Sequence, residues 1–217
     1  MKKDTKKSRS LFEGVKEFKE KDYVLHQDIF KNLEKNQNPH TLFIGCSDSR
    51  VVPNLITKSL PGELFIIRNV ANLVPFYREN VDAYLATSAA IEYAVQVLNV
   101  ENIIICGHSN CGGCRALYSS ENKLRSLPMT KKWLELAHPV KALVKEKIKA
   151  EKPDSCKRDE FTAQLNVVEQ MKHLLTFPYI KERQDKGDLN ILGWYYVIET
   201  GEVFNYSPAE NTFIRIE

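Results

Sequence analysis

The chain has 217 residues, of which 43% are hydrophobic and 27% are charged, a composition typical of a globular protein with a sizeable core. Its 31 basic and 28 acidic residues give a formal net charge of +3, which is too balanced to indicate a nucleic-acid partner. No stretch approaches the roughly 18 consecutive apolar residues of a membrane span, so we expect no membrane partner. Five cysteines make an odd count that argues against a secreted disulfide framework, and we expect a cytoplasmic protein with reduced thiols.

The N-terminal segment is basic, with five Lys or Arg and one Asp among residues 1–10. No apolar stretch of the kind found in a signal peptide follows it. We interpret residues 1–10 as a flexible, solvated segment. We see no repeat and no linker, and we predict a single domain over residues 1–217.

Residues 11–36 carry apolar side chains at helical spacing and predict two helical segments. Short apolar runs at residues 41–45, 64–67 and 103–106 predict three buried strands, each bounded by Pro or Gly turn signals. An apolar stripe over residues 81–98 predicts a helix between the second and third strands. This alternation of strands and helices is typical of a parallel sheet.

The chain is expected to be helical again from Gly112-Gly113 through much of residues 129–176, with interruptions at Pro139 and near Pro153. Residues 190–206 alternate in a way that favours strands around a turn at Thr200-Gly201. The predicted fold class is therefore α/β, with a mostly parallel central sheet flanked by helices. An N-terminal helical arm and a C-terminal helical and β extension complete it.

Two of the predicted strand–helix loops carry metal-binding side chains. The first strand leads into residues 46–50 (CSDSR), and the third leads into residues 108–113 (HSNCGG). Because the carboxyl ends of neighbouring parallel strands lie at one edge of a sheet, we expect Cys46, His108 and Cys111 to meet there. Thiolate and imidazole are ligands that tetrahedral zinc prefers, and three protein ligands leave a fourth position open for Asp48 or water.

Other cysteines and histidines have simpler interpretations. We interpret Cys106 as a small buried hydrophobe. Three histidines are interpreted as surface residues: His26, His40 and His173. Cys111 and Cys114 also form a C-x-x-C pattern, which is the alternative of a thiol redox protein. That motif lacks an aromatic residue or proline between its cysteines, and it leaves the loop 46–50 without a role.

Taken together, the two loops resemble the signature of the β-class carbonic anhydrases. Further similarity lies in residues 61–72 (PGELFIIRNVAN), 88–95 (SAAIEYAV), 193–196 and 200–201, so that it covers about residues 25–206. The resemblance implies a lyase (carbonate dehydratase) that reversibly hydrates carbon dioxide to bicarbonate and a proton, with one Zn²⁺ per chain. It also implies a homodimer, with N-terminal helices embracing the partner, or a homotetramer built as a dimer of dimers.

Carried over by position, the resemblance implies Cys46, His108 and Cys111 as zinc ligands and Asp48 with Arg50 as the catalytic pair. The pair would orient zinc-bound hydroxide, or gate the fourth zinc position by letting Asp48 occupy it in a closed state. Five further positions match substrate-pocket residues of the family: Gln37, Phe65, Val70, Tyr93 and Gly112. Several of these positions are often contributed across a dimer interface.

Two alternatives keep the same zinc loops. One is a hydrolase of carbonyl sulfide or carbon disulfide, which differs in substrate access rather than in metal ligands. The other is a non-catalytic, zinc-stabilised binding module. The presence of both Asp48 and Arg50 argues against the second alternative, because a structural zinc needs neither residue.

Overall fold

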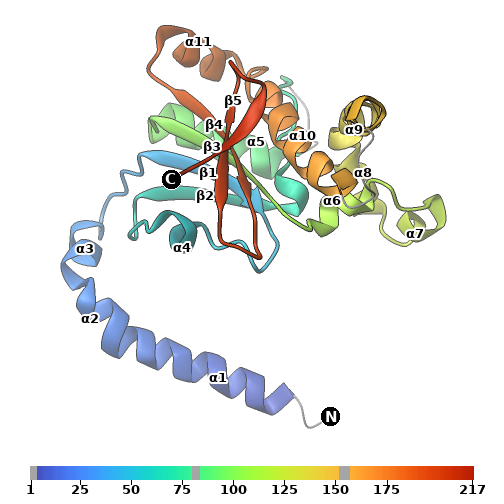
Figure 1. Cartoon of the computed structure of the whole chain (residues 1–217). Helices are drawn as coiled ribbons and strands as arrows, with labels where there is room; N and C mark the ends of the chain where they lie inside the picture. Colours follow the sequence, from blue (N-terminus) through green and yellow to red (C-terminus); the bar gives the residue numbers. More distant parts are fainter. Residues whose placement is uncertain (1–3, 80–83, 152–156) are drawn as a thin grey trace. The chain divides into compact units, whose positions relative to one another are not determined.

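The computed structural model describes residues 4–79, 84–151 and 157–217, with side chains from Ser10 onward, and divides the chain into two compact units, Met1–Asn38 and Pro39–Glu217. The first unit is helical (Figure 1). Its elements are α1 (Asp4–Glu17), the π-helical turn η1 (Phe18–Asp22), α2 (Tyr23–Leu25) and α3 (Gln27–Asn32). Helix α1 begins at Asp4, so it starts earlier than the helix expected from residue 11.

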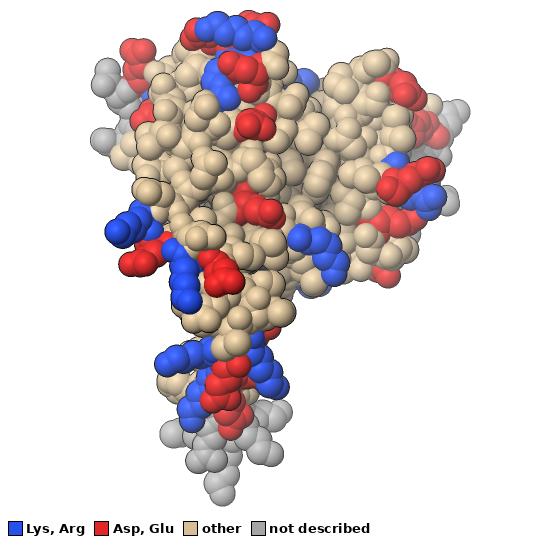
Figure 2. Space-filling view, turned by 90° about the vertical axis from the view of Figure 1, so that its left-hand side faces the viewer, with Lys and Arg blue, Asp and Glu red and all other residues tan. Residues whose placement is uncertain are grey.

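Only some of the apolar side chains of the first unit pack against one another. The rings of Phe18, Tyr23 and Phe30 pack together, with centroids 5.2–6.4 Å apart. Leu11, Phe12 and Val15 on α1 are each at least 66% exposed. Basic and acidic side chains are intermingled on these helices rather than separated by sign (Figure 2). The described side chains of the unit therefore present an apolar stripe among charges of both signs.

The second unit is built on a six-stranded sheet with the strand order β2-β1-β3-β4-β5-β6. The strands are β1 (Thr41–Cys46), β2 (Leu64–Asn69), β3 (Asn102–His108), β4 (Asn190–Tyr196), β5 (Val203–Ser207) and β6 (Thr212–Arg215). The four strands β2, β1, β3 and β4 are parallel, and β5 and β6 add antiparallel pairs at one edge. The mostly parallel sheet flanked by helices confirms the predicted fold class.

Helices and short helical turns connect the strands. The α-helices are α4 (Pro53–Thr57), α5 (Leu85–Glu92), α6 (Gly112–Ala116), α7 (Glu121–Arg125), α8 (Pro128–Leu134), α9 (His138–Glu151), α10 (Lys157–Leu174) and α11 (Pro178–Lys186). The turns are η2 (Val70–Asn72), η3 (Tyr93–Val97) and η4 (Glu135–Ala137). Among the described residues, no helix combines the length and hydropathy needed to cross a bilayer.

The core lies on both faces of the central strands. On one face, Leu42, Ile44, Ile103 and Ile105 pack against side chains of α5, α10 and α11. On the other face, Phe43 packs with Ile104, Cys106 and side chains of β4. All six residues of β1 are buried, as expected for a central parallel strand. The interpretation of Cys106 as a buried hydrophobe is therefore confirmed.

Two glycines let α10 approach the sheet closely. A Cβ at Gly107 would lie 2.7 Å from Val167, and a Cβ at Gly193 would lie 2.5 Å from the sulfur of Met171. Both distances are too short for real atoms, so the two strands need glycine where this helix crosses them. The contact fixes α10 against β3 and β4, and β3 leads directly into the loop that begins at His108.

The strands predicted at residues 41–45, 64–67 and 103–106 are confirmed, with each extended by one to three residues at its ends. Pro139 does not interrupt a helix, because it lies in the first turn of α9, where a proline needs no backbone partner. The short α4, the helix α11 and the edge strand β6 were not predicted. Part of the helix predicted at 81–98 lies outside the described residues, and the rest forms α5 and η3.

Candidate metal centre and active site

The carboxyl ends of β1 and β3 bring three metal-binding side chains together. Cys46 ends β1, His108 ends β3, and Cys111 precedes α6. One ligand atom from each residue lies within 4.8 Å of the others, and the three residues are at most 5% exposed. The sequence pattern therefore predicted the meeting of these three residues correctly.

The hydrogen bonds of His108 prepare its ring for a metal. Its Nδ1 lies 2.9 Å from the carbonyl oxygen of Ser109. Because a carbonyl only accepts hydrogen bonds, Nδ1 carries the proton and Nε2 carries a free lone pair. This Nε2 is fully buried and has no hydrogen-bond partner among the described residues. A buried lone pair without a partner is costly in a protein and fits a metal ligand.

The two sulfurs also have the spacing that zinc requires. The Sγ atoms of Cys46 and Cys111 are 3.8 Å apart. Two sulfurs that are each bound at about 2.3 Å in a tetrahedral site lie about 3.8 Å from each other. A hydrogen bond that Cys46 donates to Cys111, together with burial, raises the pKa of Cys46 to about 12. A hydrogen bond to Cys114 leads the causes that raise the pKa of Cys111 to about 12. Metal binding must therefore displace thiol protons.

Asp48 and Arg50 form an ion pair at the edge of this cluster. Arg50 donates from Nε to Oδ1 of Asp48 at 2.9 Å and from Nη2 to Oδ2 at 2.8 Å, and its backbone N–H also donates to Oδ1. These hydrogen bonds hold the pKa of Asp48 well below its usual range. Oδ2 of Asp48 lies 3.9 Å from Nε2 of His108. The carboxylate is therefore held by Arg50 while it lies within reach of the metal-binding atoms.

Arg68 supports the loop 46–50 and was not singled out from the sequence. It lies on β2, where its register partner on β1 is Gly45. Its guanidinium donates to the carbonyl oxygens of Cys46, at 3.2 Å, and Asp48, at 2.6 Å. The arginine was visible within the block 61–72, but its contacts are made to backbone carbonyls, which no side-chain motif records.

Val70 contacts the second metal-binding loop, and α10 holds it there. A Cβ at Gly113 would lie 3.0 Å from Cγ1 of Val70 and 2.8 Å from Cβ of Ala71. Asn166 donates to the carbonyl oxygen of Ala71, and Gln170 accepts from the N–H of Val74. Both polar side chains are fully buried. The loop after β2 is thus fixed against the loop that carries Cys111.

His173 corrects one interpretation from the sequence. It is fully buried, not a surface residue, and its Nδ1 lies 2.7 Å from the carbonyl oxygen of Val74. Its ring packs on Phe76, with centroids 3.9 Å apart. His173 extends the polar row of Asn166 and Gln170 on the buried side of α10. His40 is exposed as expected.

The remaining predicted pocket residues lie in different places. Phe65 on β2 and Tyr93 at the start of η3 pack on each other, with ring centroids 6.0 Å apart, and Tyr93 is 44% exposed. Gly112 is the first residue of α6 and has open space beside it. Gln37 belongs to the first unit. The structure therefore places Val70 and Gly112 at the metal-binding loops. Phe65 is partly buried against the core, and Tyr93 packs on it from the exposed side.

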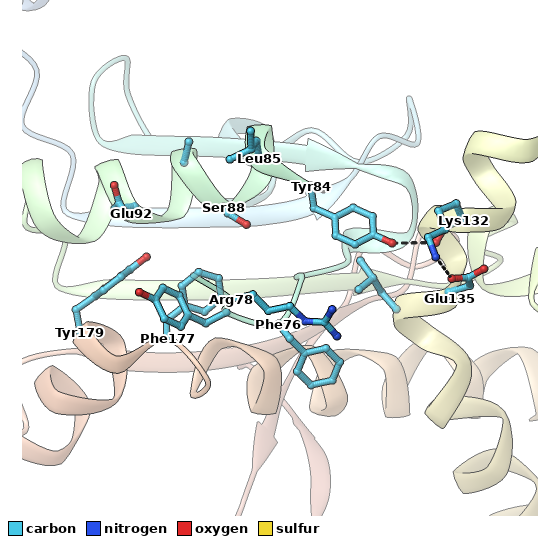
Figure 3. Close-up of a pocket in the computed structure, with 13 residues that line it drawn as sticks. Phe76, Arg78, Tyr84, Leu85, Ser88, Glu92, Lys132, Glu135, Phe177 and Tyr179 are labelled. Carbon is cyan, nitrogen blue, oxygen red and sulfur yellow. Dashed lines mark hydrogen bonds and ion pairs between the residues drawn. The ribbon is translucent and has the colours of Figure 1, made fainter. Parts of the chain in front are cut away.

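A large pocket lies away from the cluster. Its volume is about 770 Å³, and it is lined by residues that include Tyr84, Glu92, Lys132, Glu135 and Tyr179 (Figure 3). Tyr84 donates to the carbonyl oxygen of Lys132, whose ammonium pairs with Glu135 at 2.7 Å. The lining contains no predicted site residue and neither cysteine nor histidine. The metal cluster, not this pocket, has the chemistry of a reaction centre.

Comparison with known proteins agrees with this geometry. The family model described as carbonic anhydrase matches residues 41–203, which include both metal-binding loops. The chain belongs to the carbonic anhydrase family. It is 40% identical over 214 residues to a carbonic anhydrase of Helicobacter pylori J99, covering 95% of this chain and 93% of that protein. It is 39% identical over 203 residues to one of Synechococcus elongatus, covering 94% of this chain and 73% of that protein.

Solved structures place the chain in the β class of the carbonic anhydrase family. The β-carbonic anhydrase CcaA superposes with a TM-score of 0.90 at 37% identity, over 98% of this chain and 93% of that one. A tetrameric β-carbonic anhydrase of Sordaria macrospora gives a TM-score of 0.78 at 30% identity, over 92% and 96% of the two chains. The predicted enzyme class is thereby confirmed. This family is zinc-dependent, and Cys46, His108 and Cys111 are positioned to bind one metal ion.

Proposed function

We propose that this enzyme reversibly hydrates carbon dioxide to bicarbonate and a proton at the cluster of Cys46, His108 and Cys111. The observation that carries the proposal is the buried cluster with the Asp48–Arg50 pair at its edge. A structural zinc site has no use for such a pair, whereas a catalytic site needs one position free of tight protein ligands. When bound, zinc lowers the pKa of a water molecule to about 7 and so supplies hydroxide at neutral pH.

The chain's own residues would orient and regulate this chemistry. Asp48, held by Arg50, is placed to accept a hydrogen bond from the hydroxide nucleophile and so direct a lone pair at the carbon of the substrate. If Arg50 releases it, Asp48 can turn toward the metal position, since its Oδ2 already lies 3.9 Å from Nε2 of His108. Release of Asp48 would then close the site, and capture by Arg50 would open it.

The substrate pocket would combine apolar and polar walls. Carbon dioxide is small and nonpolar, so Val70 at the metal-binding loops offers it a suitable surface, and the backbone at Gly112 can help to hold it. We propose that Phe65 and Tyr93 line the pocket together with Gln37, whose amide can donate to a substrate oxygen. The exposure of Tyr93 supports a pocket that is completed by a second chain.

We further propose that the enzyme works as a homodimer or a dimer of dimers. The exposed stripe of Leu11, Phe12 and Val15 on α1 and the exposed Tyr93 and Val97 at η3 are apolar surfaces that monomers rarely leave open. The Sordaria macrospora neighbour is tetrameric. The described cysteines are free thiols, which supports a reducing, cytoplasmic location.

The arm of the first unit gives a direct test of the dimer. Phe12→Asp places a charge in the apolar stripe of α1 and is expected to shift the enzyme from dimers or tetramers toward monomers in sedimentation velocity. Ser10→Asp adds the same charge two residues earlier, on the opposite side of the helix, and is expected to leave the assembly unchanged. Equal sedimentation of both variants and the wild type would contradict a role for the arm in assembly.

The substrate is tested by comparing initial rates on carbon dioxide and carbonyl sulfide with the zinc-loaded enzyme. Proton release in a stopped-flow indicator assay is expected to give a higher kcat/KM for carbon dioxide. A clear preference for carbonyl sulfide would contradict the proposed reaction, although the metal site could still be correct.

A further inference from the structure

A glutamate in the turn after β4 contacts the metal-binding loop from the side opposite to β1. Strands β3 and β4 are parallel neighbours, with His108 paired to Tyr196 at their ends. The turn closes on itself, because the N–H of Gly201 donates to the carbonyl oxygen of Val197 at 2.9 Å. Glu199 is therefore carried on a compact turn that emerges beside residues 108–111.

Glu199 uses both oxygens of its carboxylate on this loop. The hydroxyl of Ser109 donates to Oε2 at 2.9 Å, and the side-chain amide of Asn110 donates to Oε1 at 2.7 Å. The Ser109 hydroxyl is fixed a second time by the N–H of Ile198, at 3.0 Å. Two consecutive residues between the metal ligands His108 and Cys111 are thus bound by one carboxylate.

The backbone carbonyls of the same two residues accept hydrogen bonds from His108 and Arg50. The carbonyl of Ser109 accepts from Nδ1 of His108 at 2.9 Å, and this bond fixes the tautomer that leaves Nε2 free. The carbonyl of Asn110 accepts from Nη2 of Arg50 at 3.2 Å, and Nη2 also binds Asp48. Asn110 has a left-handed backbone conformation, with φ of 55°, which asparagine adopts more readily than most other non-glycine residues.

We propose that Glu199 is a positioning residue that sets both halves of the active site through the loop 108–111. Through Ser109 it orients the metal ligand His108, and through Asn110 it holds Arg50 where Arg50 can pair with Asp48. The role of Glu199 toward Arg50 rests on the proposed function, whereas its role toward His108 concerns metal binding alone. Hydrogen bonds to the second ring nitrogen of a metal-binding histidine typically change metal affinity or activity by about 10–100-fold, and Glu199 acts on such a bond through Ser109.

The ionisation of Glu199 is consistent with this role. Hydrogen bonds from its own backbone N–H and from the Ser109 hydroxyl lower the pKa of Glu199, so the carboxylate accepts both donors at neutral pH. Ser109 is buried, whereas Glu199 lies at the surface. Removal of the Glu199 side chain is therefore expected to leave the core intact and to release the loop.

The test compares Glu199→Ala and Glu199→Gln with a matched control in the same turn. Glu202 binds only Thr200 and Arg215 among the described side chains, so Glu202→Ala removes a carboxylate without touching the loop. Each zinc-loaded variant is assayed for the rate of zinc transfer to a chelator, for kcat and KM in carbon dioxide hydration, and for Tm. The Tm separates local release of the loop from general destabilisation.

Glu199→Ala is expected to lose zinc about 10–100-fold faster than the control and to show a lower kcat per bound zinc with little change in KM. Glu199→Gln should recover part of both effects, because one oxygen acceptor remains. If Glu199→Ala lost zinc at the same rate as Glu202→Ala, Glu199 would not orient His108. If the kcat of Glu199→Ala were unchanged, Glu199 would not position Arg50. If the wild type fails to hydrate carbon dioxide, the proposed function is wrong, and zinc transfer still decides the role of Glu199 toward His108.

Discussion

Replacing Cys46 with serine is expected to remove zinc from the enzyme and to abolish carbon dioxide hydration. Cys46 lies at the end of β1, buried, with its sulfur 3.8 Å from that of Cys111. A serine hydroxyl does not ionise to a thiolate-like ligand near neutral pH, so the site keeps two of its three protein ligands. The loss of activity should exceed the roughly 10–100-fold effect of removing an outer-sphere contact. Zinc content by elemental analysis and stopped-flow rates measure both effects.

Cys106→Ala is the matched control for this substitution. Cys106 is a second buried cysteine, on the neighbouring strand β3, and it packs with Phe43 and Ile104 rather than in the metal cluster. The control variant should therefore lose some stability by leaving a small cavity, yet retain zinc and activity. If Cys46→Ser kept full zinc and full activity, Cys46 would not be a ligand.

Asp48→Asn is expected to keep zinc bound and to lose most hydration activity. The amide has the size of the carboxylate but no charge, and it cannot accept both guanidinium hydrogen bonds of Arg50 that now measure 2.9 and 2.8 Å. Because Arg50 holds the pKa of Asp48 far below neutrality, the native carboxylate stays ionised throughout the working range. Misplacing a reacting group by about 1 Å can cost about 10²-fold in rate. Activity per bound zinc measures the effect.

Asp188→Asn is the matched control, because it weakens an Asp–Arg ion pair that is not part of the metal cluster. Asp188 accepts from Nε of Arg183 at 3.0 Å, at the surface after α11. Surface pairs of this kind contribute little to stability, so the control should match the wild type in rate and zinc content. Unchanged hydration by Asp48→Asn would show that the Asp48–Arg50 pair neither orients the nucleophile nor gates the site.

The metal-binding residues could be predicted from the sequence because they follow strand ends. A short apolar run that stops at a polar loop marks the carboxyl end of a strand, and two such runs located Cys46 and His108. The sheet class followed from the same alternation. Asp48 as a candidate fourth ligand followed from the same loop, whereas its pairing with Arg50 and the pocket residues came from family resemblance. No pattern of spacing would have selected Phe65 or Val70 from ordinary core residues.

The residues that were missed act through backbone atoms or through packing. Arg68 and Glu199 support the two loops by hydrogen bonds whose partners include carbonyls and side chains from other strands. The position of Glu199 depends on β4 lying next to β3, a pairing that strand patterns alone do not give. His173 was misplaced because α10 turns a row of polar residues inward, where they bind the loop after β2, and helical periodicity assigns such residues to the surface.

Zinc at the cluster of Cys46, His108 and Cys111 is the proposed source of activity. The most direct measurement is a titration of zinc into chelator-treated enzyme, with the carbon dioxide hydration rate followed by stopped flow. The rate should rise from the buffer background in proportion to added zinc and stop rising at about one zinc per chain, as expected for one site with three protein ligands. Full hydration activity in the metal-free, folded enzyme would show that zinc at this cluster is not the source of activity.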